Sequence, residues 1–145
     1  MPSEAIHRGP EYKAAIALLA AVNLPVEDLT PAHCRDFFYM GLPGLPTALV
    51  GLEMFGDVAL LRSLAVAQGS RGSGAGSRLV SHAEDCAREE GIKALYVLTL
   101  TAESFFARRG YVRLPREAAP PAIRRSREFS SLCPAGSAFM IKPLS

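Results

Sequence analysis

The run of small residues from Gln68 to Gly76 is the feature that most constrains this chain. A strand-like apolar segment at 57–67 precedes the run, and an amphipathic segment at 77–90 follows it. Glycines allow a backbone to approach an anion closely, and the first N–H groups and the dipole of a following helix attract negative charge. The pattern therefore predicts a strand–loop–helix phosphate site, with Arg71 adding a formal positive charge.

Two better-known phosphate loops do not fit this run. A Walker loop needs a lysine after its second glycine, and the chain has none there. The dinucleotide fingerprint GxGxxG lacks its third glycine, because Ser77 follows Gly72 and Gly74 at that position. The remaining alternative is an ordinary surface turn before a helix.

The rest of the chain alternates between strand-like and helix-like segments. Apolar runs bounded by glycine and proline predict strands, and apolar residues at helical spacing predict helices. We expect helices over 11–22, 77–90, 102–109 and 121–132, and strands over 37–40, 47–55, 57–67, 94–100, 111–114 and 137–142. Gly56 suggests a hairpin between the strands at 47–55 and 57–67. This order predicts an α+β fold around one central mixed sheet.

Size and composition narrow the class of protein. A chain of 145 residues suits one domain, residues 1–145, and 49% hydrophobic with 21% charged residues is typical of a globular protein. A net charge of +2 is too small to predict nucleic acid or a membrane as the main partner. The N-terminus lacks a signal-peptide pattern, so we expect a cytoplasmic protein. Nothing sets the oligomeric state, although a homodimer is the commonest oligomer.

Cysteine and histidine spacing argues against a metal site. Cys34, Cys86 and Cys133 are odd in number and show no CxxC pair, and the three histidines are scattered. We expect no metal and no disulfide framework. Cys133 is interpreted first as a small apolar residue, and only second as a nucleophile.

The glycine run resembles a known family signature. Arg71–Gly76 followed by Leu79 is similar to the R/Q-x-x-G-x-G/A acetyl-CoA signature of the GNAT superfamily of N-acetyltransferases. The preceding Leu64, Ala65 and Val66 resemble the strand that pairs with the pantetheine arm. The resemblance implies acetyl-CoA as co-substrate, a sheet with a splayed parallel strand pair, and a cofactor site made by Leu64, Ala65, Val66, Arg71, Gly72, Ser73, Gly74, Ala75, Gly76 and Ser77.

A second set of motifs resembles one branch of that superfamily. The motifs include Leu60–Val66, Leu98–Thr101, Phe105–Phe106, Gly110–Tyr111 and Met140–Lys142. They resemble those of short N-acetylglutamate-synthase-like enzymes and, more closely, those of N-acetyltransferases of arsenic-resistance operons. The resemblance covers roughly residues 12–144. It implies that the acetyl thioester lies where the strands at 57–67 and 94–100 splay apart, and that backbone amides there stabilise an oxyanion.

Arg62 is the charged residue of an otherwise apolar strand. A buried guanidinium is costly unless it is paired. Arg62 is predicted either to clamp a substrate carboxylate, in agreement with the amino-acid substrates of the related enzymes, or to face solvent or form an internal salt bridge with Glu53. Ser63, Thr99 and Thr101 are predicted to bind substrate, with local backbone bonding as the alternative.

Glu53 is the candidate general base, and an ion-pair role beside Arg62 is equally compatible with its position. Many relatives place a tyrosine acid in the short helix after the splayed strand, but this chain has Phe105 and Phe106 there. Tyr96 and Tyr111 are alternatives by chemical type only.

The sequence predicts direct acetyl transfer from acetyl-CoA to the α-amino group of an amino acid or glutamate-like analogue, including arsenic-containing or phosphinic-acid compounds. N-acetylglutamate synthesis for arginine production is one alternative. A CoA-binding sensor without turnover is the other, and the missing tyrosine keeps it open.

Overall fold

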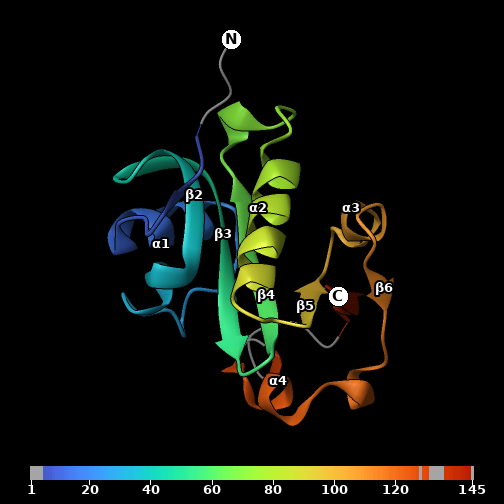
Figure 1. Ribbon diagram of the computed structural model, residues 1–145. Coiled ribbons are helices and arrows are strands. Elements are labelled where there is room, and N and C mark those ends of the chain that lie inside the picture. Colours follow the sequence, from blue (N-terminus) through green and yellow to red (C-terminus); the bar gives the residue numbers. More distant parts are fainter. Residues whose placement is uncertain (1–4, 128, 131–135, 145) are drawn as a thin grey trace.

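The computed structural model describes residues 5–127, 129–130 and 136–144. One seven-stranded sheet forms its centre, in the order β1-β2-β3-β4-β5-β7-β6 (Figure 1). The strands are β1 (His7–Arg8), β2 (Phe37–Leu42), β3 (Leu45–Phe55), β4 (Val58–Val66), β5 (Ala94–Thr99), β6 (Val112–Arg113) and β7 (Ala138–Pro143). All neighbouring pairs are antiparallel except β4 and β5, which are parallel. The predicted α+β class and mixed sheet are confirmed.

Helices cover both faces of the sheet. Helix α2 (Ala75–Glu89) packs on one face, where it buries Leu79 and Ala83 against a cluster that includes Leu61. Helix α1 (Tyr12–Ala21) belongs to a second cluster, and α4 (Pro121–Arg125) belongs to a third around Leu60. Helix α3 (Glu103–Ala107) follows β5 (Figure 1). No helix among the described residues is long and apolar enough to cross a membrane.

The helix predicted over 121–132 is interrupted at Ser126: α4 covers Pro121–Arg125, and Arg127 and residues 129–130 are again helical. Helix α4 ends at Arg125, because the backbone of Ser126 is extended (φ −63°, ψ 147°). The Ser126 hydroxyl donates to the Ile123 carbonyl at 2.7 Å and accepts from the Phe129 amide at 3.3 Å. A serine that bonds its own backbone in this way competes with helix propagation. Residues 131 and 132 lie outside the described residues.

Other boundaries also differ from the prediction, and strand β1 was not predicted. Helix α2 begins at Ala75, two residues earlier than expected, because Gly74 adopts φ 81° and serves as its N-cap. Strand β6 is shorter than 111–114, because the Tyr111 amide donates to the Phe106 carbonyl at 3.1 Å and closes the end of α3. The strand at 94–100 and the hairpin between β3 and β4 are confirmed.

Candidate active site

The parallel pair β4–β5 separates part-way along its length. Pairing runs from Val58 opposite Ala94 to Leu61 opposite Val97. Beyond this point β4 continues to Val66 and β5 to Thr99 without further pairing to each other. The splayed pair expected from the family resemblance is therefore present, and its opening begins at Arg62.

A β-bulge in β4 lies at the same point. Leu49 pairs with Ala65 and Gly51 pairs with Arg62, so two residues of β4, Ser63 and Leu64, stand opposite one residue of β3. Ser63 has φ 60°, which is uncommon for a residue with a side chain. A bulge disrupts the regular ladder and bends its strand. Backbone groups of β4 are thus redirected where the two parallel strands part.

Gly51 makes room for this arrangement on the β3 side. A Cβ at this glycine would lie 2.4 Å from the ring of Phe37, so no side chain fits there without a shift. Gly51 is also the residue that pairs with Arg62. The ring of Phe37 thus occupies the space over Gly51, next to Arg62 in the sheet.

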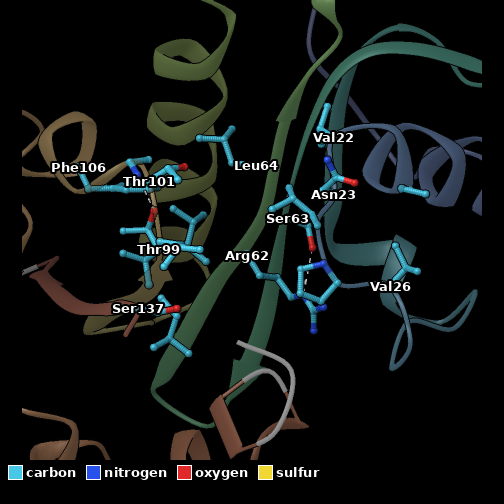
Figure 2. A pocket seen from close by; sticks show the side chains of 18 of the residues that line it. Val22, Asn23, Val26, Arg62, Ser63, Leu64, Thr99, Thr101, Phe106 and Ser137 are labelled. Atoms are coloured by element: carbon cyan, nitrogen blue, oxygen red, sulfur yellow. Dashed lines mark hydrogen bonds between the residues drawn. The ribbon is translucent and has the colours of Figure 1, made fainter. Parts of the chain in front are cut away.

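The larger cavity, about 960 Å³, opens at the splay (Figure 2). Leu61–Leu64 of β4 line it on one side, and residues 97–102 of β5 and the following turn line it on another. The segment 22–27 after α1 supplies a further wall. In Figure 2, Thr99, Thr101, Phe106 and Ser137 lie across the cavity from Arg62, Ser63 and Val26.

A second cavity of about 630 Å³ adjoins the first. The residues common to both are Val22, Leu24, Leu64, Thr101 and Ala102. Nine of the ten predicted cofactor residues line the second cavity: Leu64, Ala65, Val66, Arg71, Gly72, Gly74, Ala75, Gly76 and Ser77. The tenth, Ser73, is not among its lining residues and donates from its hydroxyl to the Ser70 carbonyl at 2.7 Å.

The glycine run places the start of α2 against this second cavity. Gly72 and Gly74 adopt φ 82° and 81°, a region that residues with side chains avoid. The amides of Ala75, Gly76 and Ser77 belong to the first turn of a helix, which has no intrahelical acceptors for them. Donors and helix dipole together suit a phosphate anion.

Arg109 is a residue of this cavity that the sequence analysis missed. Its guanidinium stacks on the Phe105 ring at 3.6 Å, donates to the Phe105 carbonyl at 2.7 Å and bonds the Ser77 hydroxyl. Arg108 and Arg109 line the cavity together with Arg71. The positive charge next to the α2 N-terminus therefore comes from the turn after α3 as well as from the glycine run. The family motif contains no signal for it, because the two segments meet only in the fold.

Arg62 is buried, with 1% of its side chain exposed, and is paired by two carboxylates. Nη1 and Nη2 donate to the two carboxylate oxygens of Asp28 at 2.6 and 2.9 Å, and Nη1 also donates to Glu53 at 3.1 Å. The internal salt bridge with Glu53 considered from sequence is present. Asp28, which carries the bidentate contact, was not predicted, because nothing in its loop sequence marks it.

The ion pair with Arg62 lowers the pKa of Asp28. Burial acts to raise the pKa of this carboxyl, but the hydrogen bonds and positive charge of Arg62 outweigh burial, so the pKa of Asp28 lies below its ordinary value. Asp28 is therefore ionised throughout the physiological range.

Glu53 and His33 extend this cluster. The Glu53 carboxylate lies 3.9 Å from His33 Nε2, while His33 Nδ1 accepts from the Thr30 amide at 3.0 Å. Asp28, His33 and Glu53 offer ligand atoms within 4.8 Å of one another, but the cation that the two carboxylates contact is the guanidinium of Arg62. Glu53 is not among the residues lining either cavity.

The predicted hydroxyl residues lie at the larger cavity and already make local bonds. Ser63 Oγ accepts from Arg62 Nε at 3.1 Å, and Thr99 Oγ1 accepts from the Ala102 amide at 3.0 Å, at the start of α3. Thr101 lines both cavities. Ser137, at the start of β7, also lines the larger cavity and was missed from sequence.

No tyrosine stands where a general acid would be expected among the residues that line the two cavities. Phe106 lines the larger cavity and Phe105 the smaller one, so the segment that carries a tyrosine in many relatives presents only hydrocarbon rings. Tyr111 is buried and donates to Glu84 Oε2 at 2.9 Å, and Tyr96 stacks on Phe139. Neither tyrosine lines the two cavities. Cys133 lies outside the described residues.

Comparison with known proteins identifies the family. A family model described as the acetyltransferase (GNAT) family matches residues 27–112, more than half of the chain. The chain belongs to this family. The adjoining cavities lie at the strand splay of this family member.

Two curated relatives match parts of this GNAT domain. An uncharacterized N-acetyltransferase of Chlorobaculum tepidum is 37% identical over 94 residues, which cover 64% of this chain and 60% of the relative. An amino-acid acetyltransferase of Ralstonia nicotianae is 38% identical over 68 residues, 47% of this chain and 15% of that enzyme. The chain thus spans less than two thirds of the length of either relative.

Solved structures share the fold across the whole GNAT domain. N-acetylglutamate synthase from Neisseria gonorrhoeae, complexed with coenzyme A and N-acetyl-glutamate, superposes with a TM-score of 0.84 at 21% identity, covering 100% of this chain and 36% of that one. A Mycobacterium tuberculosis protein in complex with CoA gives a TM-score of 0.78 at 20% identity, with 97% and 99% coverage.

Proposed function

We propose that this GNAT domain transfers the acetyl group of acetyl-CoA directly to the α-amino group of an amino acid or a glutamate-like analogue, including arsenic-containing or phosphinic-acid compounds. One observation carries the proposal. The smaller cavity, at the glycine run and the start of α2, adjoins the larger cavity at the point where β4 and β5 separate. The smaller cavity suits the CoA pyrophosphate and the larger one an acceptor, so thioester and amine would meet at the residues common to both.

Direct transfer needs four events at this junction. The amine loses a proton, its nitrogen bonds to the thioester carbon, the carbonyl oxygen gains negative charge, and the C–S bond breaks. In this proposal, backbone N–H groups at the bulge of Ser63 and Leu64 stabilise that oxygen, because the bulge interrupts the ladder at the splay. No tyrosine, histidine, lysine or cysteine lines either cavity among the described residues. A thiol of modest basicity, pKa about 8.5 for cysteine, leaves as a thiolate without a dedicated acid.

Two charged residues are assigned to the acceptor in this proposal. Arg62 supplies the positive charge of the larger cavity and is held in one orientation by Asp28, which suits recognition of an acceptor carboxylate. Glu53 lines neither cavity, so it would take the amine proton through a water molecule; its carboxylate is 20% exposed and contacts Arg62, which lines the larger cavity. Ser63, Thr99 and Thr101 bind the rest of the acceptor.

Two alternatives remain distinct from this proposal. N-acetylglutamate synthesis is favoured by the similarity to the amino-acid acetyltransferase of Ralstonia nicotianae. A CoA-binding sensor without turnover is favoured by the two phenylalanines of α3, which leave the cavities without a ring hydroxyl.

A panel of acceptors tests the proposal and separates the alternatives. Acetyl-CoA would be incubated with L-glutamate, its phosphinic and arsinic analogues, other amino acids, and amines that lack a carboxylate, and free thiol would be measured. We expect thiol release with a carboxylate-bearing α-amino acceptor and little with simple amines. A strong preference for plain glutamate supports the synthase, and CoA binding with no thiol release from any acceptor supports the sensor.

A further inference from the structure

The wall of the larger cavity at residues 22–27 is an irregular segment with no strand pairing. Its start is fixed by the end of α1. Asn23 adopts φ 62°, its amide donates to the Ala20 carbonyl, and the Leu24 amide donates to the Leu19 carbonyl. These two bonds form a Schellman motif, which ends a helix and sets the direction of the chain that leaves it.

The far end of this wall is fixed by three consecutive residues. Asp28 forms the bidentate ion pair with Arg62, the Leu29 carbonyl accepts from the Tyr12 hydroxyl at 2.9 Å, and the Thr30 amide donates to His33 at 3.0 Å. Of these contacts, the one made by Asp28 reaches the sheet, because Arg62 belongs to β4. The side chains of Asp28 and Arg62 are 5% and 1% exposed, so solvent screens their attraction little.

Arg62 is also bonded to the bulge in β4, where the two parallel strands separate. Arg62 Nε donates to Ser63 Oγ at 3.1 Å, and Ser63 is the positive-φ residue of the bulge. A line of contacts thus joins the acceptor wall, through Asp28 and Arg62, to the backbone at the strand splay. A planar guanidinium is well suited to this task, because it holds Asp28, Glu53 and Ser63 in one geometry.

We propose that Asp28 is a positioning residue for the acceptor: its ion pair with Arg62 holds the 22–27 wall and the β4 bulge in the arrangement that binds the amine. This inference rests on the acceptor site proposed above. It assigns Asp28 no contact with substrate. Asn23, Pro25, Val26 and Glu27 line the larger cavity alone, while Val22 and Leu24 at the start of the wall also line the smaller one, so we expect acceptor binding to change more than acetyl-CoA binding.

Asp28→Asn tests this role, since asparagine keeps the shape but loses the charge and one acceptor oxygen. We expect the KM for L-glutamate, or for its phosphinic analogue if that is the better acceptor, to rise at least about tenfold, and the KM for acetyl-CoA to stay within about twofold. Hydrogen exchange in 22–27 should accelerate by about tenfold or more, while α2 is unchanged. Asp36→Asn is the matched control, because Asp36 forms an exposed ion pair with Arg8 away from both cavities.

Several outcomes would overturn the role. A lower KM for the acceptor would make Asp28 a competitor for Arg62, and equal acceleration of exchange in α2 would make it a general stabilising residue. If Asp28→Asn does not fold, Asp28→Glu, which keeps the charge but adds a methylene, is expected to show a smaller rise in acceptor KM with unchanged acetyl-CoA KM. If the wild-type chain releases no thiol with any acceptor, the proposed function fails, and the exchange measurement still decides whether Asp28 holds the wall.

Discussion

A guanidinium buried in an apolar strand needs anionic partners, and the two partners of Arg62 differ in how far the sequence reveals them. Glu53 is visible, because a hairpin places its strand beside that of Arg62 and nine residues separate the two. Asp28 is 34 residues away, in a loop whose path depends on the end of α1. The sequence therefore indicates that Arg62 is paired or used, while the partner that binds both of its terminal nitrogens is set by tertiary structure.

Glu53 gives a prediction at the scale of one residue. If Glu53 accepts the amine proton, Glu53→Gln should lower kcat at least about a hundredfold and leave the KM for acetyl-CoA unchanged, because glutamine accepts no proton. The measurement is a steady-state pH profile of kcat for both forms. A loss below about threefold would leave Glu53 as an ion-pair partner of Arg62 alone, with the amine reaching the cavity already deprotonated.

At the scale of elements, the glycine run determines where α2 begins. Gly74 is the N-cap at φ 81°, and a Cβ placed there meets nothing within 4 Å. A side chain at this position is thus accommodated in space but strained in backbone, by about 1–3 kcal/mol. The proposed phosphate site is centred on the backbone of one short segment, so a sequence motif can mark it, whereas Arg108 and Arg109 of the same cavity carry no such mark.

Gly74→Glu tests that element directly. We expect the Kd for CoA to rise at least about a hundredfold, because the new carboxylate would lie at the proposed pyrophosphate site. Calorimetric titration with CoA measures the loss, and circular dichroism checks the fold. Gly69→Glu is the matched control, since a Cβ at Gly69 also meets nothing within 4 Å and the residue lines neither cavity. Tight CoA binding by the Gly74 variant would place the pyrophosphate elsewhere.

The other elements show where local pattern stops being sufficient. Strands and helices with strong periodicity, such as β4, β5 and α2, lie where the sequence predicts them, since the pattern reflects the faces they bury. Helix α4 stops early because the hydroxyl of Ser126 bonds nearby backbone, a choice that periodicity does not encode. The β4 bulge is equally hidden, because it is defined only by the register against β3.

At the scale of the whole molecule, the acceptor cavity is formed by segments distant in sequence. Residues 22–27, 61–64, 97–102 and Ser137 meet at the splay, and Arg109 joins the smaller cavity from the turn after α3. Such a site follows from topology, so residues such as Ser137 carry no local signal. What the sequence could supply was the donor side, where chemistry and local structure coincide.

A buried polar cluster couples α2 to the far edge of the sheet and governs stability at high pH. Tyr111 is 1% exposed and donates to Glu84, which also pairs with Lys142 at 3.0 Å. Burial first, and then the negative charge of Glu84, raise the pKa of Tyr111 above its ordinary value of 10. The unfolded chain loses this proton at lower pH than the folded one. The contribution of Tyr111 is therefore fully present below pH 10 and is lost as the pH rises further.

Tyr111→Phe should reveal both the hydrogen bond to Glu84 and the pH dependence that the Tyr111 hydroxyl adds to stability. At pH 7 we expect a loss of about 1–2 kcal/mol in the free energy of unfolding, because Glu84 keeps Lys142 but loses one donor. Above pH 10 the variant should lose less stability per pH unit than the wild type, since it has no proton to hold at this position. Urea unfolding at pH 7, 9 and 11 measures both, with Tyr39→Phe as control because Tyr39 is also buried but packs on His7. If the stability of the wild type and of Tyr111→Phe fell equally with pH above pH 10, this assignment would be contradicted. Tyr96, whose pKa is raised chiefly by burial, would then be the next tyrosine to test.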